Sequence, residues 1–191
     1  MHSNFFFGYG SLVNCDTHGF TPVRRARARG WRRAWRATTE RRLAFLTAMP
    51  DVNAQIDGLT APVPDGDWAA LDQREYAYDR HNAEEVVDHL DALDVLSPRI
   101  AIYAIAPERM GPATKDHPIL LSYLDVVIQG YLRHFGKDGV ERFVASTHGW
   151  DAPVLNDRAA PIYPRAQRLT DAETALVDHI LKTQGSVLIL S

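Results

Sequence analysis

The chain has 191 residues, of which 46% are hydrophobic and 24% are charged, and its formal net charge is -3. This balance is typical of a water-soluble globular protein, and no apolar run approaches the roughly 20 residues that cross a bilayer, so membrane insertion is not expected. Cys15 is the only cysteine, which excludes an internal disulfide and leaves a cysteine-based zinc site without partners. We therefore expect one domain over residues 1–191, in a reducing cytoplasm and without a metal.

An apolar, strand-forming run leads into a glycine-containing turn near the start of the chain. Phe5–Phe7 favour a strand, whereas Gly8 and Gly10 lack Cβ atoms and permit positive φ angles. A loop of this kind allows a ligand to approach the main chain, and the N–H groups of residues 10–12 could converge on an anion or a carbonyl oxygen. Taken alone, the spacing favours an ordinary β-turn with a buried Tyr9.

Arginine residues are concentrated between Arg24 and Arg42. Large and small residues alternate over Arg25–Trp31, which predicts a strand with one arginine-rich face. Because Trp31 and Trp35 lie among the arginines, the segment could bind nucleic acid through phosphate contacts and base stacking. The net acidic charge of the chain favours the alternative, a solvated strand face, so we do not expect a nucleic-acid partner.

Two further strands and a short helix are predicted next. Residues 42–48 have the composition of a strand that ends at Pro50, and residues 56–61 that of another strand that ends at Pro62. The Pro64–Gly66 segment has turn chemistry. Asp67 then stands where it can cap a short helix.

Glu75 lies near the end of this helix, just before Tyr76 and Tyr78. Aromatic surroundings would desolvate its carboxyl group and raise its pKa, which suits proton transfer near neutral pH. The alternative is an exposed glutamate paired with Arg74 or Arg80, and the local sequence alone favours it.

The next segments alternate between helix and strand signals. The spacing of apolar residues predicts a helix from Asn82 to about Leu93, with a strand as the alternative. Residues 99–105 have the composition of a buried strand. An apolar stripe predicts a helix over residues 118–135, ended by Gly136, with a second helix after it.

The last part of the sequence contains a long loop and one well-marked helix. Residues 151–168 are rich in Pro, Asp and Arg and predict an ordered loop, of a kind that often surrounds a binding cleft. Thr170 begins a capping box for a helix to about Lys182. Residues 187–190 predict a terminal strand or an apolar tail.

Two separated motifs resemble the γ-glutamylcyclotransferase superfamily. They are Phe7-Gly8-Tyr9-Gly10-Ser11-Leu12 and, further along, Leu71-Asp72-Gln73-Arg74-Glu75. Residues 30–35 and 56–59 resemble that family's second strand and the glycine-bearing strand before its glutamate, so the resemblance extends to about Arg80. It implies an α+β fold, a small mixed β-barrel flanked by helices, in which the glycine-containing loop and Glu75 face one another across a cavity.

The same resemblance implies an activity. It is the cyclisation of the γ-glutamyl group of a γ-glutamyl amide or peptide to 5-oxoproline with release of the amine, and the form of the first motif leans toward the glutathione-acting branch. Glu75 would be the general acid/base, and no cofactor would be needed. The substrate-binding residues would be Tyr9, Gly10, Ser11 and Leu12. The partner is then a small-molecule γ-glutamyl substrate, and the alternative is a non-catalytic binding module for a γ-glutamyl or other amino metabolite.

A few other polar residues are weaker candidates. Arg32 could reach a substrate carboxylate, and Tyr78, Tyr163 and Arg165 could line the cleft. Ser11 lacks a supporting His or Asp motif, so we assign it to binding rather than to nucleophilic attack. The histidines have no spacing that indicates a metal site.

Overall fold

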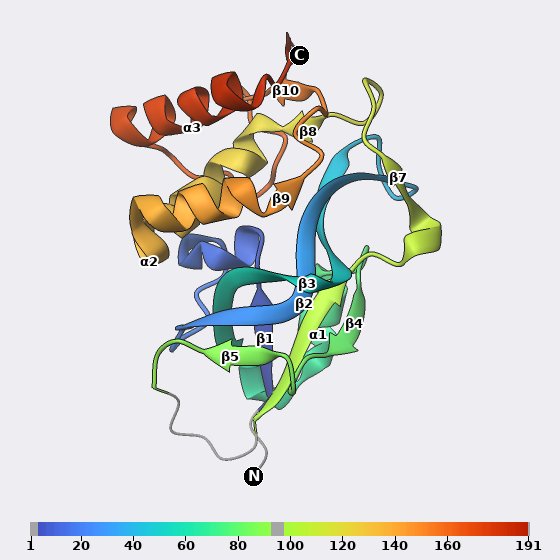
Figure 1. Ribbon diagram of the computed structural model, residues 1–191, viewed down its shortest axis with the longest axis vertical. Helices are drawn as coiled ribbons and strands as arrows, with labels where there is room; N and C mark the ends of the chain where they lie inside the picture. Colours follow the sequence, from blue (N-terminus) through green and yellow to red (C-terminus); the bar gives the residue numbers. More distant parts are fainter. Residues whose placement is uncertain (1–3, 93–97, 191) are drawn as a thin grey trace.

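The computed structural model describes residues 4–92 and 98–190, and its largest element is a mixed sheet curled into a half-barrel (Figure 1). The strand order is β4-β6-β1-β3-β2-β5, and β7 and β9 also pair with β2. β1 is parallel to β6 and β2 is parallel to β9, whereas the other pairs are antiparallel. The strands are β1 (Asn4–Gly8), β2 (Arg24–Thr38), β3 (Ala44–Pro62), β4 (Asp79–Asn82), β5 (Val87–His89), β6 (Arg99–Ala104), β7 (Met110–Pro112) and β9 (Thr147–His148).

A layer formed by two α-helices and a small parallel sheet lies against one side of the half-barrel (Figure 1). It contains α2 (Leu121–Ala145), α3 (Asp171–Gln184), β8 (Ile119–Leu120), β10 (Val154–Asn156) and β11 (Leu188–Leu190). The third α-helix of the described residues, α1, spans Trp68–Arg74, and short 3-10 turns occur at Ser11–Val13, Cys15–Thr17, Pro64–Gly66 and Pro107–Arg109. The expected α+β class with a mixed, curled sheet and flanking helices is confirmed.

The central strand β1 is buried on both faces, which accounts for its uninterrupted run of aromatic residues. Phe5 and Phe7 pack into the main core together with residues of α2. Phe6 points the other way, into a smaller cluster that contains Leu71 and Tyr103. Because side chains alternate along a strand, Phe5 and Phe7 cover one face of β1 and Phe6 covers the other, so both faces of the strand are apolar.

The strands β2 and β3 form a long hairpin with one irregularity. The register shifts between Arg29, which faces Gln55, and Trp31, which faces Pro50. The prediction of two separate strands divided at Pro50 was therefore wrong, because Ala44–Pro62 is one strand. Proline is tolerated at this irregularity because the ladder is already interrupted there.

A turn and the short strand β5 replace the helix predicted from Asn82, so the strand alternative is correct. Asn82 does cap the backbone locally, since its Oδ1 accepts a hydrogen bond from the Glu84 N–H at 2.9 Å. The chain then enters β5, where Val87 pairs with Ala28 of β2 and is buried in the main core. Pairing with a long neighbouring strand thus overrides the helical spacing, and Leu93 lies outside the described residues.

The helix α2 begins later than predicted, whereas its break at Gly136 and the second helical part after it are as predicted. It starts at Leu121 rather than at Pro118, because Ile119 and Leu120 form β8 beside β10. Gly136 interrupts it with a φ of 67°, as its expected role of ending a helix requires, and helical structure continues to Ala145. The capping box at Thr170 is confirmed, with both of its reciprocal hydrogen bonds to Glu173.

Candidate functional site

The loop after β1 is built by close contacts of its two glycines. A Cβ atom on Gly8 would lie 2.5 Å from the Leu12 Cβ, and one on Gly10 would lie 2.6 Å from the Tyr123 Oη. Neither glycine has the positive φ that the sequence suggested, and the φ of Gly10 is -112°. Glycine is therefore needed at both positions because the loop is packed tightly, and this packing brings Tyr123 of α2 against the main chain.

The main chain of the loop keeps N–H groups available next to Tyr123. The N–H groups of Val13 and Asn14 close the turn on the carbonyl oxygens of Gly10 and Ser11, both at 3.0 Å. The Ser11 N–H contacts the Tyr123 hydroxyl, and among the described residues no acceptor is found for the Leu12 N–H. The Leu12 N–H is therefore free to bind an oxygen of a small molecule, whereas the Ser11 N–H would first have to release the Tyr123 hydroxyl.

The side chain of Tyr9 is a structural tie rather than a free hydroxyl. Tyr9 is 6% exposed. Its Oη donates to the Tyr103 carbonyl oxygen at 2.6 Å and accepts from the Ala48 N–H at 2.9 Å. Its own carbonyl oxygen lies 3.0 Å from the Tyr131 hydroxyl. Tyr9 thus joins β3, β6 and α2 and fixes the start of the loop.

Glu75 is the C-terminal cap of α1. The helix is capped at its start by Asp67, whose Oδ1 accepts from the Ala69 N–H at 2.8 Å, so this part of the sequence prediction is confirmed. At its end, the Glu75 side chain is 16% exposed and accepts a hydrogen bond from Arg74 Nε at 3.0 Å. The alternative of an exposed glutamate is therefore wrong, because the Glu75 side chain is largely buried, although the pairing with Arg74 that it included is present.

Burial controls the protonation of this carboxyl group. It raises the pKa of Glu75 above its ordinary value, while the charges of Arg74 and Arg165 oppose the rise. The phenols of Tyr78 and Tyr123 have pKa values raised well above their ordinary value by burial. At neutral pH these two phenols, which line the same cavity as Glu75, are therefore uncharged, and the Tyr78 hydroxyl donates to the Leu46 carbonyl oxygen at 3.0 Å.

A cavity with a volume of about 170 Å³ opens in front of Glu75. A smaller recess of about 30 Å³ adjoins it, and Ser11, Glu75, Tyr78 and Tyr123 line both. On the same measure a water needs about 10–15 Å³, so the larger space suits a small metabolite. The recess is lined by every residue of the predicted site, namely Tyr9, Gly10, Ser11, Leu12 and Glu75.

The weaker candidates divide between this cavity and other parts of the molecule. Tyr78, Tyr163 and Arg165 line the larger cavity, together with Ile162 of the same long loop. Arg32 does not line it, and its Nε lies 3.9 Å from Asp51. The loop over residues 151–168 therefore contributes a wall of the cavity.

Sequence reasoning missed three residues of the site. Tyr123 was assigned to the apolar stripe of α2, and Tyr103 to a buried strand. Arg41 lines the larger cavity and donates from its Nε to the Tyr76 hydroxyl at 3.1 Å. The only signal in the sequence was a tyrosine within the apolar stripe, because a buried phenol needs a polar partner.

Positive charge predominates around Glu75. Arg41, Arg74 and Arg165 all line the larger cavity, whereas Glu75 is its only carboxylate among the described residues. A cavity of this kind favours small molecules that carry carboxylate groups. The described residues contain no group of three His, Cys, Asp or Glu side chains placed to hold a metal ion.

Comparisons with known proteins identify the fold. No family model matches the sequence, and no curated protein matches it. A structure described as a gamma-glutamyl cyclotransferase has a TM-score of 0.57 at 13% identity, over 93% of this chain and 99% of that one. An uncharacterised protein from Homo sapiens has a TM-score of 0.56 at 13% identity over the same shares.

A third similar structure is YkqA from Bacillus subtilis, with a TM-score of 0.58 at 14% identity. The match covers 78% of this chain and 57% of that chain. At these identities the comparisons establish a shared fold, and they confirm the fold that the two sequence motifs implied.

Proposed function

We propose that the protein is a γ-glutamylcyclotransferase-like enzyme, which cyclises the γ-glutamyl group of a γ-glutamyl amide or peptide to 5-oxoproline and releases the amine. The observation that carries the proposal is the convergence of Glu75 and the loop over residues 9–12 on one recess beside a larger cavity. A fold shared with a gamma-glutamyl cyclotransferase supports it. With a single cysteine in the sequence, we assign the enzyme to the cytoplasm.

The first step is removal of a proton from the substrate's α-ammonium group. The Glu75 carboxylate accepts this proton, and the free amine then attacks the γ-carbonyl carbon of the same glutamyl chain. The raised pKa of Glu75 makes its carboxylate a stronger base than an exposed glutamate, while the hydrogen bond from Arg74 keeps an ionised form accessible. Because the attack is intramolecular, holding the chain bent lowers the entropic part of the barrier.

The second step is formation and collapse of the tetrahedral intermediate. A new bond joins the amine nitrogen to the γ-carbon, and negative charge develops on the former carbonyl oxygen. Ser11, Leu12 and Tyr123 line the recess, and their two N–H groups and the phenol hydroxyl would donate to such an oxygen. The carbon–nitrogen bond to the leaving group then breaks, and protonated Glu75 returns its proton to the departing amine. The ring nitrogen still carries one extra proton after the attack, and it passes this proton to the regenerated Glu75 carboxylate, which releases it to solvent.

The substrate is a small molecule rather than a macromolecule. The cavity of about 170 Å³ accepts a γ-glutamyl group, and its arginines suit a carboxylate-bearing compound such as glutathione or a γ-glutamyl dipeptide. None of the helices in the described residues is long and apolar enough to cross a membrane.

The direct test is 5-oxoproline release by the Glu75→Gln variant. The wild-type protein is given glutathione, γ-glutamyl dipeptides and γ-glutamylamines, and each compound that it turns over is then given to the variant. Gln keeps the size of the side chain but cannot accept the proton, so turnover is expected to fall by about 10² to 10⁴-fold. Wild-type turnover by this variant on every substrate would contradict the mechanism.

Glu108→Gln is the matched control. Glu108 is exposed and lies in a 3-10 turn that does not line the cavity, so its turnover should equal that of the wild type. Calorimetry on the wild-type protein separates the enzyme from a binding module on the same fold. Tight binding of a γ-glutamyl compound without any 5-oxoproline would assign the binding module instead.

A further inference from the structure

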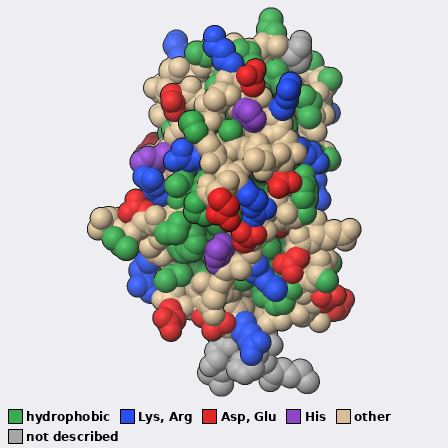
Figure 2. All heavy atoms as spheres, turned by 90° about the vertical axis from the view of Figure 1, so that its right-hand side faces the viewer, with side chains coloured by type: hydrophobic (Ala, Val, Ile, Leu, Met, Phe, Trp, Pro, Cys, Tyr) green, Lys and Arg blue, Asp and Glu red, His purple; other side chains and the backbone are tan. Residues whose placement is uncertain are grey.

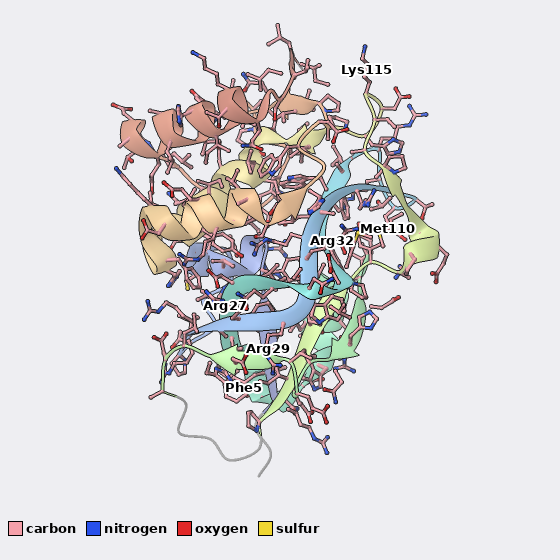
Figure 3. The ribbon with its side chains drawn as sticks, viewed as in Figure 1. Phe5, Arg27, Arg29, Arg32, Met110 and Lys115 are labelled. Atoms are coloured by element: carbon pink, nitrogen blue, oxygen red, sulfur yellow. The ribbon has the colours of Figure 1, made fainter. Side chains whose placement is uncertain are left out.

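A second cavity lies between the hairpin of β2 and β3 and the C-terminal part of α2. Its volume is about 240 Å³, and it shares no lining residue with the cavity in front of Glu75. In Figure 3, Arg27 lies on the part of β2 that runs between β5 and the layer of α2. The polar residues of this second cavity are Arg27, Arg33, Gln55, Asp57, Arg142 and Ser146.

One buried carboxylate in this cavity is shared by two arginines. Asp57 is 4% exposed, and its two oxygens accept hydrogen bonds from Arg27 Nε and Arg142 Nε, each at 2.7 Å. Among the described residues, no hydrogen bond is found for the terminal nitrogens of either arginine. The side chains are 30% and 49% exposed respectively, so a molecule from solvent can reach these free donors.

A third arginine adds a buried positive charge. Arg33 is fully buried, and its guanidinium group donates to the Asp57 carbonyl oxygen at 2.9 Å, the Tyr131 hydroxyl at 2.6 Å and the Ser146 hydroxyl at 2.6 Å. All of these acceptors are uncharged. Three guanidinium groups therefore lie around a single carboxylate, and a cationic group without a full complement of negative charge is costly to bury.

Neighbouring arginines on the same strand differ in this respect. Arg25 is paired with Asp91 and Arg29 with Asp88, both at 2.7 Å, so each has a carboxylate of its own. The charges of these two neighbours are thus balanced one to one, whereas the charge around Asp57 is not.

The end of α2 opposes an anion there only weakly. The carbonyl end of a helix carries partial negative charge. Here the carbonyl oxygen of Arg142 accepts from the Ser146 N–H at 3.0 Å and that of Phe143 accepts from the Thr147 hydroxyl at 2.6 Å. Because these oxygens are already hydrogen-bonded, the three guanidinium groups determine the sign of the local charge.

We propose that this second cavity is a binding site for an oxyanion, a phosphate or carboxylate group carried by a small molecule, held by the terminal nitrogens of Arg27 and Arg142. Paired guanidinium donors match such groups geometrically. The bound anion supplies the negative charge that Asp57 alone does not provide. The site is separate from Glu75, so its existence does not depend on the proposed enzyme activity.

The test is calorimetry with inorganic phosphate and with acetate, at an ionic strength held constant with potassium chloride. The wild-type protein is expected to bind at least one of the two. Binding of phosphate alone assigns a phosphate-bearing ligand, and binding of acetate assigns a carboxylate-bearing one. Arg142→Gln is expected to weaken binding at least about tenfold, since it removes charge-assisted hydrogen bonds.

Three further variants make the result decisive. Arg142→Lys keeps the ion pair with Asp57 but loses the forked donors, so it should also weaken binding even if Arg142→Gln folds poorly. Arg25→Gln removes an exposed, ion-paired arginine of the same strand and should bind as the wild type does. Arg165→Gln tests whether the anion binds instead in the cavity in front of Glu75, which Arg165 lines. The proposal is overturned if neither anion binds, or if Arg165→Gln abolishes binding while the Arg142 variants retain it.

Discussion

At the scale of single residues, Glu75 combines a buried position with a charge that the fold does not fully compensate. Its side chain is 16% exposed, and its direct ionic partner in the described residues is Arg74, at 3.0 Å. Burial outweighs this partner, because the pKa of Glu75 is raised overall. A residue suited to accept a proton therefore lowers the stability of the folded state when it is ionised.

The sign of the effect gives a prediction for Glu75→Gln. Below the unfolded pKa of about 4.3, Glu75 is protonated in both the folded and the unfolded state, so its charge does not reduce the free energy of unfolding. As the pH rises through the higher folded pKa, the folded state loses stability. Thermal unfolding should therefore show that Glu75→Gln gains stability relative to the wild type at about pH 8 and loses that gain toward about pH 4.

The control for this prediction is Glu108→Gln, in which an exposed carboxylate is removed. Its unfolding temperature should follow that of the wild type over the same pH range. If Glu75→Gln were less stable than the wild type at the higher pH, the hydrogen bond with Arg74 would outweigh burial, and the assigned direction of the pKa shift would be wrong.

At the scale of elements, a buried side chain at the start of the long loop after β10 binds the first turn of α2, beside the ion pair of Arg158 with Asp125 of the same helix. Asp157 is 2% exposed. Its Oδ1 accepts from the Ser122 N–H at 2.8 Å, and its Oδ2 accepts from the Ser122 hydroxyl at 2.5 Å and from the Ile162 N–H at 2.8 Å. Asp157 therefore caps α2 and also positions the loop that brings Tyr163 to the cavity.

Asp157→Ala should loosen the cavity as well as the fold. The substitution leaves the N–H groups of Ser122 and Ile162 without their acceptor, which costs roughly 3 kcal/mol in total. The unfolding temperature should then fall by roughly 10 °C, and the KM for the γ-glutamyl substrate should rise because the loop wall is no longer fixed.

The exposed Asp151 provides the control Asp151→Ala, which should change neither the unfolding temperature nor the KM. An unchanged KM in a destabilised Asp157→Ala protein would show that the loop is held by other contacts.

Elements with strong local signals could be predicted from the sequence, and elements decided by distant partners could not. The caps at Asp67 and Thr170 are confirmed because each depends on hydrogen bonds to residues two or three positions away. In contrast, β5 follows a segment with helical spacing, and its pairing with β2 overrides that spacing. The role of Asp157 has no local signal, because its acceptor oxygens serve Ser122, far along the chain.

At the scale of the whole molecule, the site is formed by segments that only the fold brings together. The loop over residues 9–12 and Glu75 could be paired from the sequence because both belong to motifs that resemble one family. Tyr123 could not, since it shares its apolar stripe with residues that lie in the core. The three guanidinium groups around Asp57 were likewise hidden, because Arg142 approaches from α2 and is 85 positions away in the sequence.

The charge distribution of the whole molecule gives a last prediction, that DNA and RNA columns will not retain the protein in a salt-dependent manner. The basic segment that raised this possibility is neutralised in part, because Arg25 and Arg29 each form an ion pair with an aspartate of their own. The face in Figure 2 shows basic and acidic side chains interspersed, and the chain carries a net charge of -3. Nucleic-acid binding requires several unpaired cations near phosphates, whose counterion release makes retention fall steeply with salt. Retention at low salt that disappears steeply as salt is added would contradict the prediction, and Arg29→Gln would then show whether β2 is the surface responsible.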